Sequence, residues 1–269
     1  MESFVFKQFT VSHTRSAMKV NTDGVLLAAW LDLPETNTFD EFLDIGTGTG
    51  VISLILAQRA YSSASAISGK KFQITGIDID SPSIEDAMYN FQRSKWSDIL
   101  TSEAISLQEY VLKKGQKERF SLIVSNPPYF TNSFKSPHER RSVARHNDSL
   151  PLNVLIDEAS YMLKENGVLA LILPIGESMA VIDHAKKGAL SLTRLCRVRP
   201  TPAKAEKRYM LEFRKTDSKR DNDHIDNTAR PGISEEELVI QNTDGTYTEK
   251  YCNTISEYYY KDFRTKKLF

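Results

Sequence analysis

The chain has 269 residues, 40% of them hydrophobic and 26% charged, values that are typical of a folded globular protein and that exclude a wholly disordered chain. Its 35 Lys and Arg residues balance its 35 Asp and Glu residues, which excludes a global electrostatic preference for nucleic acid or an acidic membrane surface. The N-terminus has no leader pattern and no apolar run approaches the roughly 18 residues of a membrane span, so we expect a cytoplasmic protein without membrane contact.

The first half of the sequence alternates between predicted strands and helices. Thr22 or Asp23 is expected near the cap of the first helix, and Pro82 at the first position of a later one. In chain order we expect a short strand at 4–11, a helix at 23–31, a strand at 41–45 that enters a glycine turn and a helix at 51–60, a loop at 62–71, a strand at 72–77 and a helix from Ser81.

The second half continues the alternation and ends in two strands that we expect to pair antiparallel. After a weaker strand near 99–107, we expect a strand at 120–125, a polar loop at 130–148 and a helix from Leu150 that ends at a cap formed by Asn166 and Gly167. A strongly apolar strand at 168–174, a helix at 178–187 and strands at 190–198 and 208–213 follow. This order predicts an α/β fold with a mainly parallel sheet covered on both faces.

We expect a single domain over residues 1–269. It comprises an N-terminal segment at 1–33, a core at 40–214, a mobile polar loop at 215–233 and a C-terminal tail at 234–269, whose aromatic residues pack it on the core.

A glycine turn between the strand at 41–45 and the next helix carries the first motif. Gly46, Gly48 and Gly50 allow a ligand to approach the backbone at a helix N-terminus. A dinucleotide fingerprint places its third glycine one residue later, and Asp44 would repel a pyrophosphate but accept a hydrogen bond from an ammonium group. The turn therefore favours S-adenosyl-L-methionine over NAD, with a ligand-free tight turn as the alternative.

Asp78 ends the next strand, where a carboxylate can accept hydrogen bonds from both hydroxyls of an adenosine ribose. The alternative role is a helix cap. Asp80 fits that role better because it lies directly before Ser81 and Pro82.

Asn126, Pro127, Pro128 and Tyr129 follow the apolar strand at 120–125 and form a rigid corner. The Asn126 side-chain oxygen and the Pro127 carbonyl can accept both hydrogens of a planar amine, which directs its lone pair and stabilises the charge that grows on nitrogen during methyl transfer. Tyr129 can stack on a base turned out of its loop. A purely structural proline turn is the alternative.

Three basic groups offer RNA contacts; a solvated loop is the alternative role for the first, and packing of the tail is the favoured role for the tyrosines of the third. The first lies in the loop after the corner and the third in the aromatic tail. Their members are Arg140, Arg141, Arg145 and His146; Lys204, Lys207 and Arg208; and Lys261, Arg264, Lys266 and Lys267 beside Tyr258, Tyr259 and Tyr260. Two cysteines and five scattered histidines match no metal-ligand spacing, so no metal is expected.

Taken together, these motifs resemble the S-adenosylmethionine-dependent methyltransferases that modify planar nitrogens. The N-terminal blocks 6–9, 17–20 and 22–24, with 237–240 and 247–251 in the tail, are similar to the bacterial valine-tRNA adenine N6-methyltransferases. The resemblance implies a Rossmann-like class I fold with a seven-stranded sheet, and methylation of adenine N6 at position 37 of valine tRNA. We expect a monomer. One departure is Ser106, which stands where the family tends to have an aspartate facing the cofactor adenine.

The resemblance and the motifs together assign roles to individual residues. Asn126, Pro127 and Tyr129 are the expected catalytic residues. The expected cofactor site comprises Lys19, Thr22, Asp44, Gly46, Gly48, Gly50, Asp78, Ile79 and Asn126, and the expected substrate site comprises Asp23, Pro128, Tyr129, Arg140, Arg141 and Arg145.

Two other functions use the same fold. A protein glutamine methyltransferase of the release-factor type uses the same corner on a planar amide, but should carry a separate N-terminal helical domain for which this sequence has no room. A non-catalytic RNA-binding module is the second alternative, and the intact corner argues against it.

Overall fold

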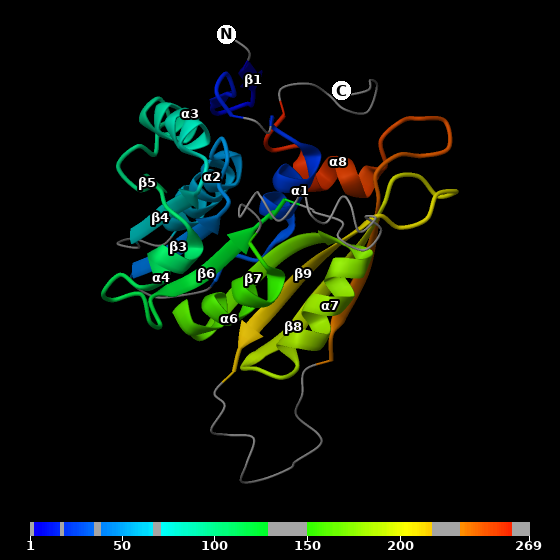
Figure 1. Ribbon diagram of the computed structural model, residues 1–269. Helices are drawn as coiled ribbons and strands as arrows, with labels where there is room; N and C mark the ends of the chain where they lie inside the picture. Colours follow the sequence, from blue (N-terminus) through cyan, green and yellow to red (C-terminus); the bar gives the residue numbers. More distant parts are fainter. Residues whose placement is uncertain are drawn as a thin grey trace, which may run out of the picture.

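The computed structural model describes residues 3–16, 19–34, 39–66, 71–128, 150–216 and 232–259. Its centre is a sheet of eight strands (Figure 1). They are β3 (Phe39–Ile45), β4 (Lys71–Asp78), β5 (Leu100–Ala104), β6 (Phe120–Ser125), β7 (Leu163–Pro174), β8 (Leu190–Arg199), β9 (Arg208–Lys215) and β10 (Ser234–Val239).

The strands lie in the order β10-β8-β9-β7-β6-β3-β4-β5. From β5 to β7 every neighbouring pair is parallel, and β9 runs antiparallel to both β7 and β8. The prediction of a mainly parallel sheet whose last pair is antiparallel is therefore confirmed. As a result, the carboxyl ends of β4, β3, β6 and β7 meet at one edge.

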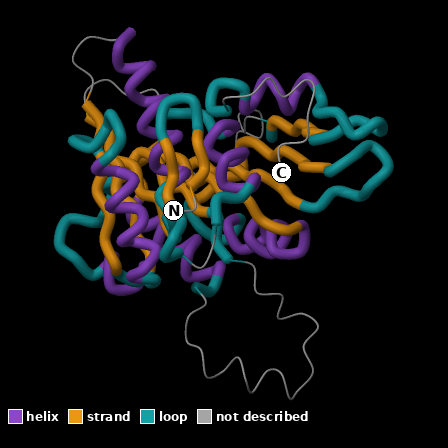
Figure 2. The backbone as a smooth tube through the Cα atoms, turned by 90° about the horizontal axis from the view of Figure 1, so that it is seen from above, coloured by secondary structure: helices purple, strands orange, loops and turns teal. Residues whose placement is uncertain are grey.

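Helices cover both faces of the sheet, as Figure 2 shows with the strands between them. One face carries α1 (Thr22–Trp30), α2 (Val51–Ala66), α3 (Ser81–Gln92) and α8 (Glu249–Ile255), and the other carries α4 (Leu107–Val111), α6 (Leu152–Met162) and α7 (Ile175–Ala185). Each face has its own apolar core. Leu26, Ile55 and Phe91 belong to the first core, and Leu155 and Val181 to the second. β6 and the second half of β7 are buried on both sides, which explains their nearly continuous apolar sequences.

The N-terminal segment forms a hairpin where the sequence predicted one strand. β1 (Ser3–Val5) and β2 (Thr10–Ser12) pair antiparallel, because the chain turns back at residues 6–9. Phe6 at this turn is buried, stacks on Phe9 and bridges to Tyr259 of the tail. The two ends of the chain thus pack against each other.

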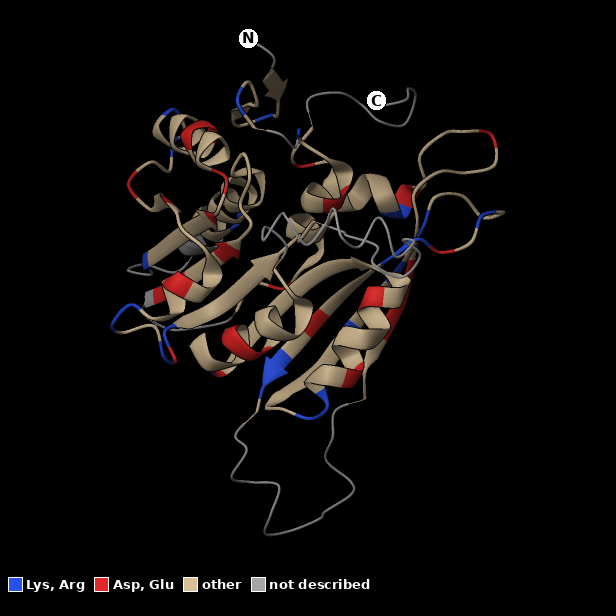
Figure 3. Ribbon diagram, in the orientation of Figure 1, with Lys and Arg blue, Asp and Glu red and all other residues tan. Residues whose placement is uncertain are grey.

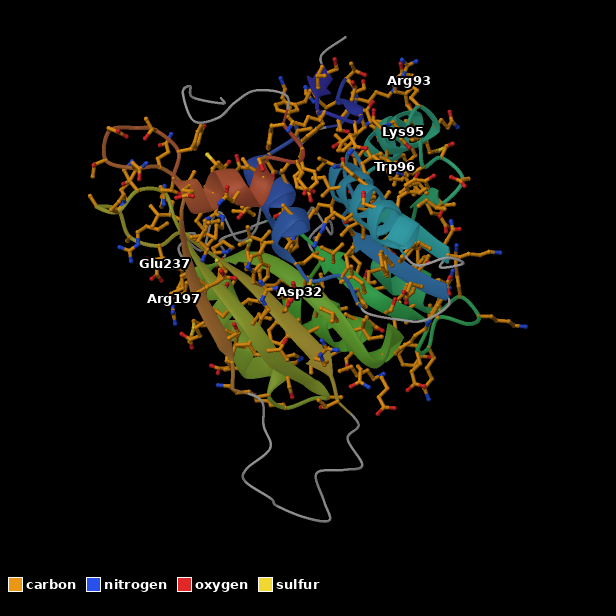
Figure 4. All side chains as sticks on the ribbon, turned by 180° about the vertical axis from the view of Figure 1, so that it is seen from behind. Asp32, Arg93, Lys95, Trp96, Arg197 and Glu237 are labelled. Atoms are coloured by element: carbon orange, nitrogen blue, oxygen red, sulfur yellow. The ribbon has the colours of Figure 1, made fainter. Side chains whose placement is uncertain are left out.

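The sheet has one strand more than the seven expected. β10 is that eighth strand, and it pairs parallel with β8 at the edge of the sheet. Four of its six residues, Ser-Glu-Glu-Glu, rarely form strands, so β-propensity gave little indication that this segment joins the sheet. Arginines of β8 compensate the charges: Arg197 pairs with Glu235 at 2.6 Å, and Figure 4 shows Arg197 beside Glu237 on the neighbouring strand.

Two boundaries also differ from prediction. The helix expected to end at Asn166 and Gly167 ends at Met162, and both residues lie inside β7. Asn166 takes a positive φ of 61° there, near a register shift between β6 and β7, so an αL signal that suits a helix cap marks a strand irregularity instead. α2 continues to Ala66 through part of the predicted loop at 62–71. The predicted loop at 130–148 and most of the one at 215–233 lie outside the described residues.

The turn from β3 into α2 requires glycine at its last position. Gly50 has a φ of +81°, and a Cβ there would lie 2.4 Å from Cε1 of Phe91, a buried ring of α3. Gly46 also has a positive φ, +71°, but a Cβ there would meet nothing within 4 Å. Conformation and packing both select glycine at position 50, whereas conformation alone selects it at position 46.

We predict that Gly50→Ala lowers the free energy of unfolding by roughly 2–4 kcal/mol, because the cost of a left-handed backbone at alanine adds to the cost of displacing the Phe91 ring from the core. Gly46→Ala, the matched control, should cost only roughly 1 kcal/mol. Urea unfolding of the ligand-free protein measures both. Equal losses would contradict the packing argument.

Candidate functional site

A cavity of about 280 Å³ lies at the carboxyl edge of the sheet. It opens over the ends of three adjacent strands, β6, β3 and β4. Seven of the residues expected at the site line it: Gly46, Gly48, Asp78, Ile79, Asn126, Pro127 and Pro128. The cavity is thus built where a doubly covered parallel sheet usually holds its ligand.

Asp44, near the end of β3, lies beneath the glycine turn and is fully buried. Its Oδ2 accepts hydrogen bonds from the hydroxyls of Thr47 at 2.7 Å and Ser53 at 2.8 Å. Its Oδ1 is buried and accepts no hydrogen bond within the described part of the chain. Burial raises the pKa of Asp44 to about 6, although the two hydroxyls oppose that shift. A buried carboxylate oxygen without a donor is suited to a ligand that brings one.

Asp78 ends β4 and holds the turn from the other side. Its Oδ2 accepts from the Gly48 N–H at 2.9 Å and its Oδ1 accepts from the Asp80 N–H at 2.9 Å. Burial raises the pKa of Asp78, and the backbone donors oppose this. Each carboxylate oxygen can still accept a further hydrogen bond.

Asp80 is the N-cap of α3, as expected. Its Oδ2 accepts from the Ser83 N–H at 3.1 Å and from the Ser83 hydroxyl at 2.5 Å.

Asn126 follows β6 directly and faces the N-terminus of α1. Its Nδ2 donates to Oδ1 of Asn21 at 3.3 Å, and the same Asn21 oxygen accepts from the Gly24 N–H at 2.9 Å as the N-cap of α1. This contact fixes which end of the Asn126 amide faces α1. Pro127 beside it is buried and Pro128 is exposed. The corner is therefore rigid and oriented.

The segment between β5 and α4 forms a further part of the cavity wall. Ile105 and Leu107 supply apolar surface, and Ser106 between them caps α4 in a reciprocal pair with Glu109. Ser106 thus lies on the cavity wall, but its hydroxyl is already engaged with the Glu109 carboxylate at 2.7 Å.

Several predicted residues lie elsewhere. Gly50 packs under Phe91, and Lys19 and Thr22 are absent from the cavity lining, with Lys19 exposed and Thr22 the first residue of α1. Asp23 accepts from Nε of Arg208, at the start of β9, at 3.0 Å. Tyr129, Arg140, Arg141 and Arg145 lie outside the described residues, so their roles stay predictions.

Sequence reasoning missed the residues that position the N-terminal segment. Asp86 of α3 has a fully buried side chain whose Oδ2 accepts from the backbone N–H groups of Arg15 and Ser16, both at 2.9 Å. One turn later, Asn90 exchanges hydrogen bonds with the Ser12 backbone and donates to the Thr49 carbonyl at 2.9 Å. An Asp and an Asn four residues apart on an apolar helix face were the available signal.

Asn21, Thr47 and Ser53 were missed as well. Asn21 stands directly before Thr-Asp-Gly, a visible cap signal, whereas the partners of Asp44 could be recognised only from the turn's geometry. In the described residues no three His, Cys, Asp or Glu side chains gather as metal ligands would. Likewise, none of the described helices has the length and apolarity that a bilayer crossing requires.

Comparison with known proteins identifies relatives along nearly the whole chain. The model of the methyltransferase small domain family matches residues 15–177. The tRNA1(Val) (adenine(37)-N6)-methyltransferase of Flavobacterium johnsoniae is 35% identical over 258 residues, which cover 96% of this chain and 99% of that protein. The protein of the same name from Flavobacterium psychrophilum is 36% identical over 258 residues, with 96% and 99% coverage.

Among solved structures, a predicted O-methyltransferase from Agrobacterium tumefaciens is similar with a TM-score of 0.60. Its sequence identity is 15%, and the match covers 88% of this chain and 96% of that one. At this identity the likeness shows the fold alone, which is that of the class I methyltransferases.

We predict that Asp44→Asn stabilises the ligand-free protein at neutral pH. The folded-state pKa of Asp44 lies above its unfolded value, so the wild type loses stability as the pH rises from about 4 to about 6, and the loss then stays constant. A pKa shift of this size corresponds to a loss of about 3 kcal/mol in the free energy of unfolding. Asparagine does not ionise, so the variant avoids this loss. Urea unfolding at pH 4 and pH 8 tests this. The difference in free energy of unfolding between variant and wild type should be small at pH 4 and large at pH 8.

The control is Asp98→Asn, at an exposed position. It should show no gap that grows over this pH range. A growing gap in the control, or a constant one for Asp44→Asn, would contradict the assignment.

Proposed function

The chain belongs to the family of the tRNA1(Val) (adenine(37)-N6)-methyltransferases, and we propose that it transfers a methyl group from S-adenosyl-L-methionine to N6 of adenine 37 in a valine tRNA. The observation that carries the proposal is the convergence of three residues at the ends of three adjacent strands: Asp78 and Asn126 line one cavity, and Asp44 is buried beneath the glycine turn that borders it. Asp44 and Asp78 suit the donor, and Asn126 suits the acceptor.

The donor fits the groups that the glycine turn and its two aspartates present. The unpartnered Oδ1 of Asp44 complements an ammonium group, and Asp78 has acceptor capacity left for ribose hydroxyls. The backbone at Gly46 and Gly48 has no Cβ that would keep a ligand away. When bound, S-adenosyl-L-methionine supplies a methyl group on a positively charged sulfur, ready for in-line transfer.

The Asp44 carboxylate must be ionised to pair with an ammonium group. Its raised pKa of about 6 therefore implies that donor binding weakens as the pH falls through that value.

The corner after β6 suits a planar amine. An adenine amino group is a weak nucleophile because its lone pair is delocalised into the ring. The Asn126 side-chain oxygen and the Pro127 carbonyl would accept its two N–H groups, align the lone pair and stabilise the positive charge that grows on nitrogen. Once the N–C bond forms and the S–C bond breaks, the methylated amine is acidic and loses its proton without a strong base.

The base must leave its stack to reach the corner. In a single-stranded anticodon loop this costs less than in a duplex, and the flat surfaces of Pro127 and Pro128 at the cavity offer contact to an extruded ring. Stacking by Tyr129, and phosphate contacts by Arg140, Arg141 and Arg145, are further parts of the proposal.

A direct test uses purified protein, S-adenosyl-L-methionine labelled in its methyl group and unmodified valine tRNA. We expect label in N6-methyladenosine at position 37, identified by mass spectrometry of the digested nucleosides. A release factor with an unmodified glutamine is the comparison substrate. Label in the protein glutamine and none in tRNA would favour the glutamine methyltransferase, and no transfer to either would favour a non-catalytic RNA-binding module.

We predict that Asn126→Ala lowers kcat for tRNA methylation by about 10²–10³-fold, because one of two charge-stabilising acceptors is lost. Donor affinity, measured by calorimetry, should change much less, since the turn and both aspartates remain. Asn253→Ala, the same substitution at an exposed position of α8, is the matched control and should leave kcat unchanged. An active Asn126→Ala protein would rule out the proposed role of the corner.

A further inference from the structure

The loop between β8 and β9, residues 200–207, reaches the same edge of the sheet as the candidate site. Ser125 of β6 is level with Leu171 of β7, which is level with Leu211 of β9. Because β9 runs antiparallel, its first residue, Arg208, lies three residues beyond Leu211 towards the carboxyl edge. Two strand spacings, about 10 Å, separate β9 from β6 across the sheet. Figure 1 shows the loop projecting beyond this edge, in yellow.

This loop has more cations than its neighbours neutralise. Residues 199–208 contain four cations, Arg199, Lys204, Lys207 and Arg208, and one anion, Glu206. Arg199 pairs with Glu237 at 2.9 Å and with Glu206 at 3.6 Å, and Arg208 pairs with Asp23 at 3.0 Å. Lys204 and Lys207 are exposed, and neither forms an ion pair with any other described residue. Figure 3 shows blue segments along this loop.

The backbone of the loop is fixed at both ends. The Lys207 N–H donates to the Val198 carbonyl at 2.9 Å, and the Lys204 N–H donates to the Thr201 carbonyl at 3.1 Å. The chain after β10 braces it from the side, since the Gln241 N–H donates to the Pro200 carbonyl at 3.0 Å. Cations on a braced backbone lose less conformational entropy on binding than those on a flexible one.

The loop is also linked to the corner itself. Arg208 holds Asp23 in the first turn of α1, and Asn21, the N-cap of that helix, accepts from Asn126. An RNA that delivers a base to Asn126 must place its backbone over this edge, because the rest of the molecule lies beneath it.

We infer that Lys204 and Lys207 contact phosphates of the tRNA backbone beside the methylated base. The inference rests on the proposed function, and it adds the second of the three basic groups in the sequence to the RNA contacts proposed there for the first. Phosphate contacts position the RNA without reading its sequence, so these lysines should govern affinity and its salt dependence but not the chemistry.

The test compares two double variants with the same charge change and the same spacing. Lys204→Gln with Lys207→Gln removes the proposed contacts. Lys114→Gln with Lys117→Gln removes two exposed lysines just before β6, at the opposite edge of the sheet. Binding of unmodified valine tRNA to the whole protein is measured between about 0.05 and 0.2 M salt.

For the Lys204 and Lys207 pair we expect about tenfold weaker binding at the lower salt concentration, and a plot of log affinity against log salt that is shallower by about 1.4–1.8. The kcat at saturating tRNA should stay at the wild-type value. The control pair should match the wild type in both slope and affinity.

Equal slopes for the two pairs, with an active wild-type enzyme, would overturn this inference and leave the proposed function standing. A lower kcat with an unchanged slope would overturn it too. Failure of the wild type to methylate tRNA at all would overturn both.

Discussion

Parallel strands that are buried on both faces impose the main constraint on this molecule. Burying a polar group along such a strand is costly unless it is hydrogen-bonded, so most of the polar chemistry of the candidate site collects where the strands end. β6, β3 and β4 are neighbours in the sheet, although β6 follows the other two in sequence. That order brings Asn126 next to Asp44 and Asp78 at one edge. The methyl donor and the amine acceptor can therefore be held by separate strands with a fixed spacing, set by the backbone ladder and not by flexible side chains.

Asp44 shows how a group that is unfavourable in the ligand-free protein can favour ligand binding. Its carboxylate is fully buried, two hydroxyls satisfy one oxygen, and the other oxygen accepts no hydrogen bond among the described residues. Ionisation there is unfavourable in the ligand-free chain, which is why its pKa is raised to about 6. A cationic ligand group would remove much of that penalty. The site therefore destabilises the free protein in the same interaction that would give it affinity for the donor.

The sequence predicted the sheet type and the site motifs because both rest on local signals. Apolar runs mark the strands, glycine spacing marks the turn, and two prolines mark the corner. The strand-like pattern at residues 238–240 indicated the end of β10 but not its place in the sheet, because three consecutive glutamates precede it and are compensated by arginines of β8 that lie about 40 residues away in sequence. Asn166 was misassigned for a related reason, since its positive φ serves a strand irregularity whose partner lies in β6. Interactions between residues far apart in the chain leave no pattern in the local sequence from which they could be predicted.

The anchoring of the N-terminal segment also depends on contacts between residues far apart in sequence, and it links this segment to the candidate site. Asp86 and Asn90 hold the backbone of residues 12–16 on α3, and Asn90 also holds the Thr49 carbonyl in the glycine turn. A few residues later, Asn21 caps α1 and meets Asn126. One helix therefore positions both the glycine turn and the segment that leads to the corner. Asp80, the N-cap of α3, lies two residues after Asp78 and donates its N–H to the Asp78 carboxylate, so any shift of this helix would move both halves of the site together.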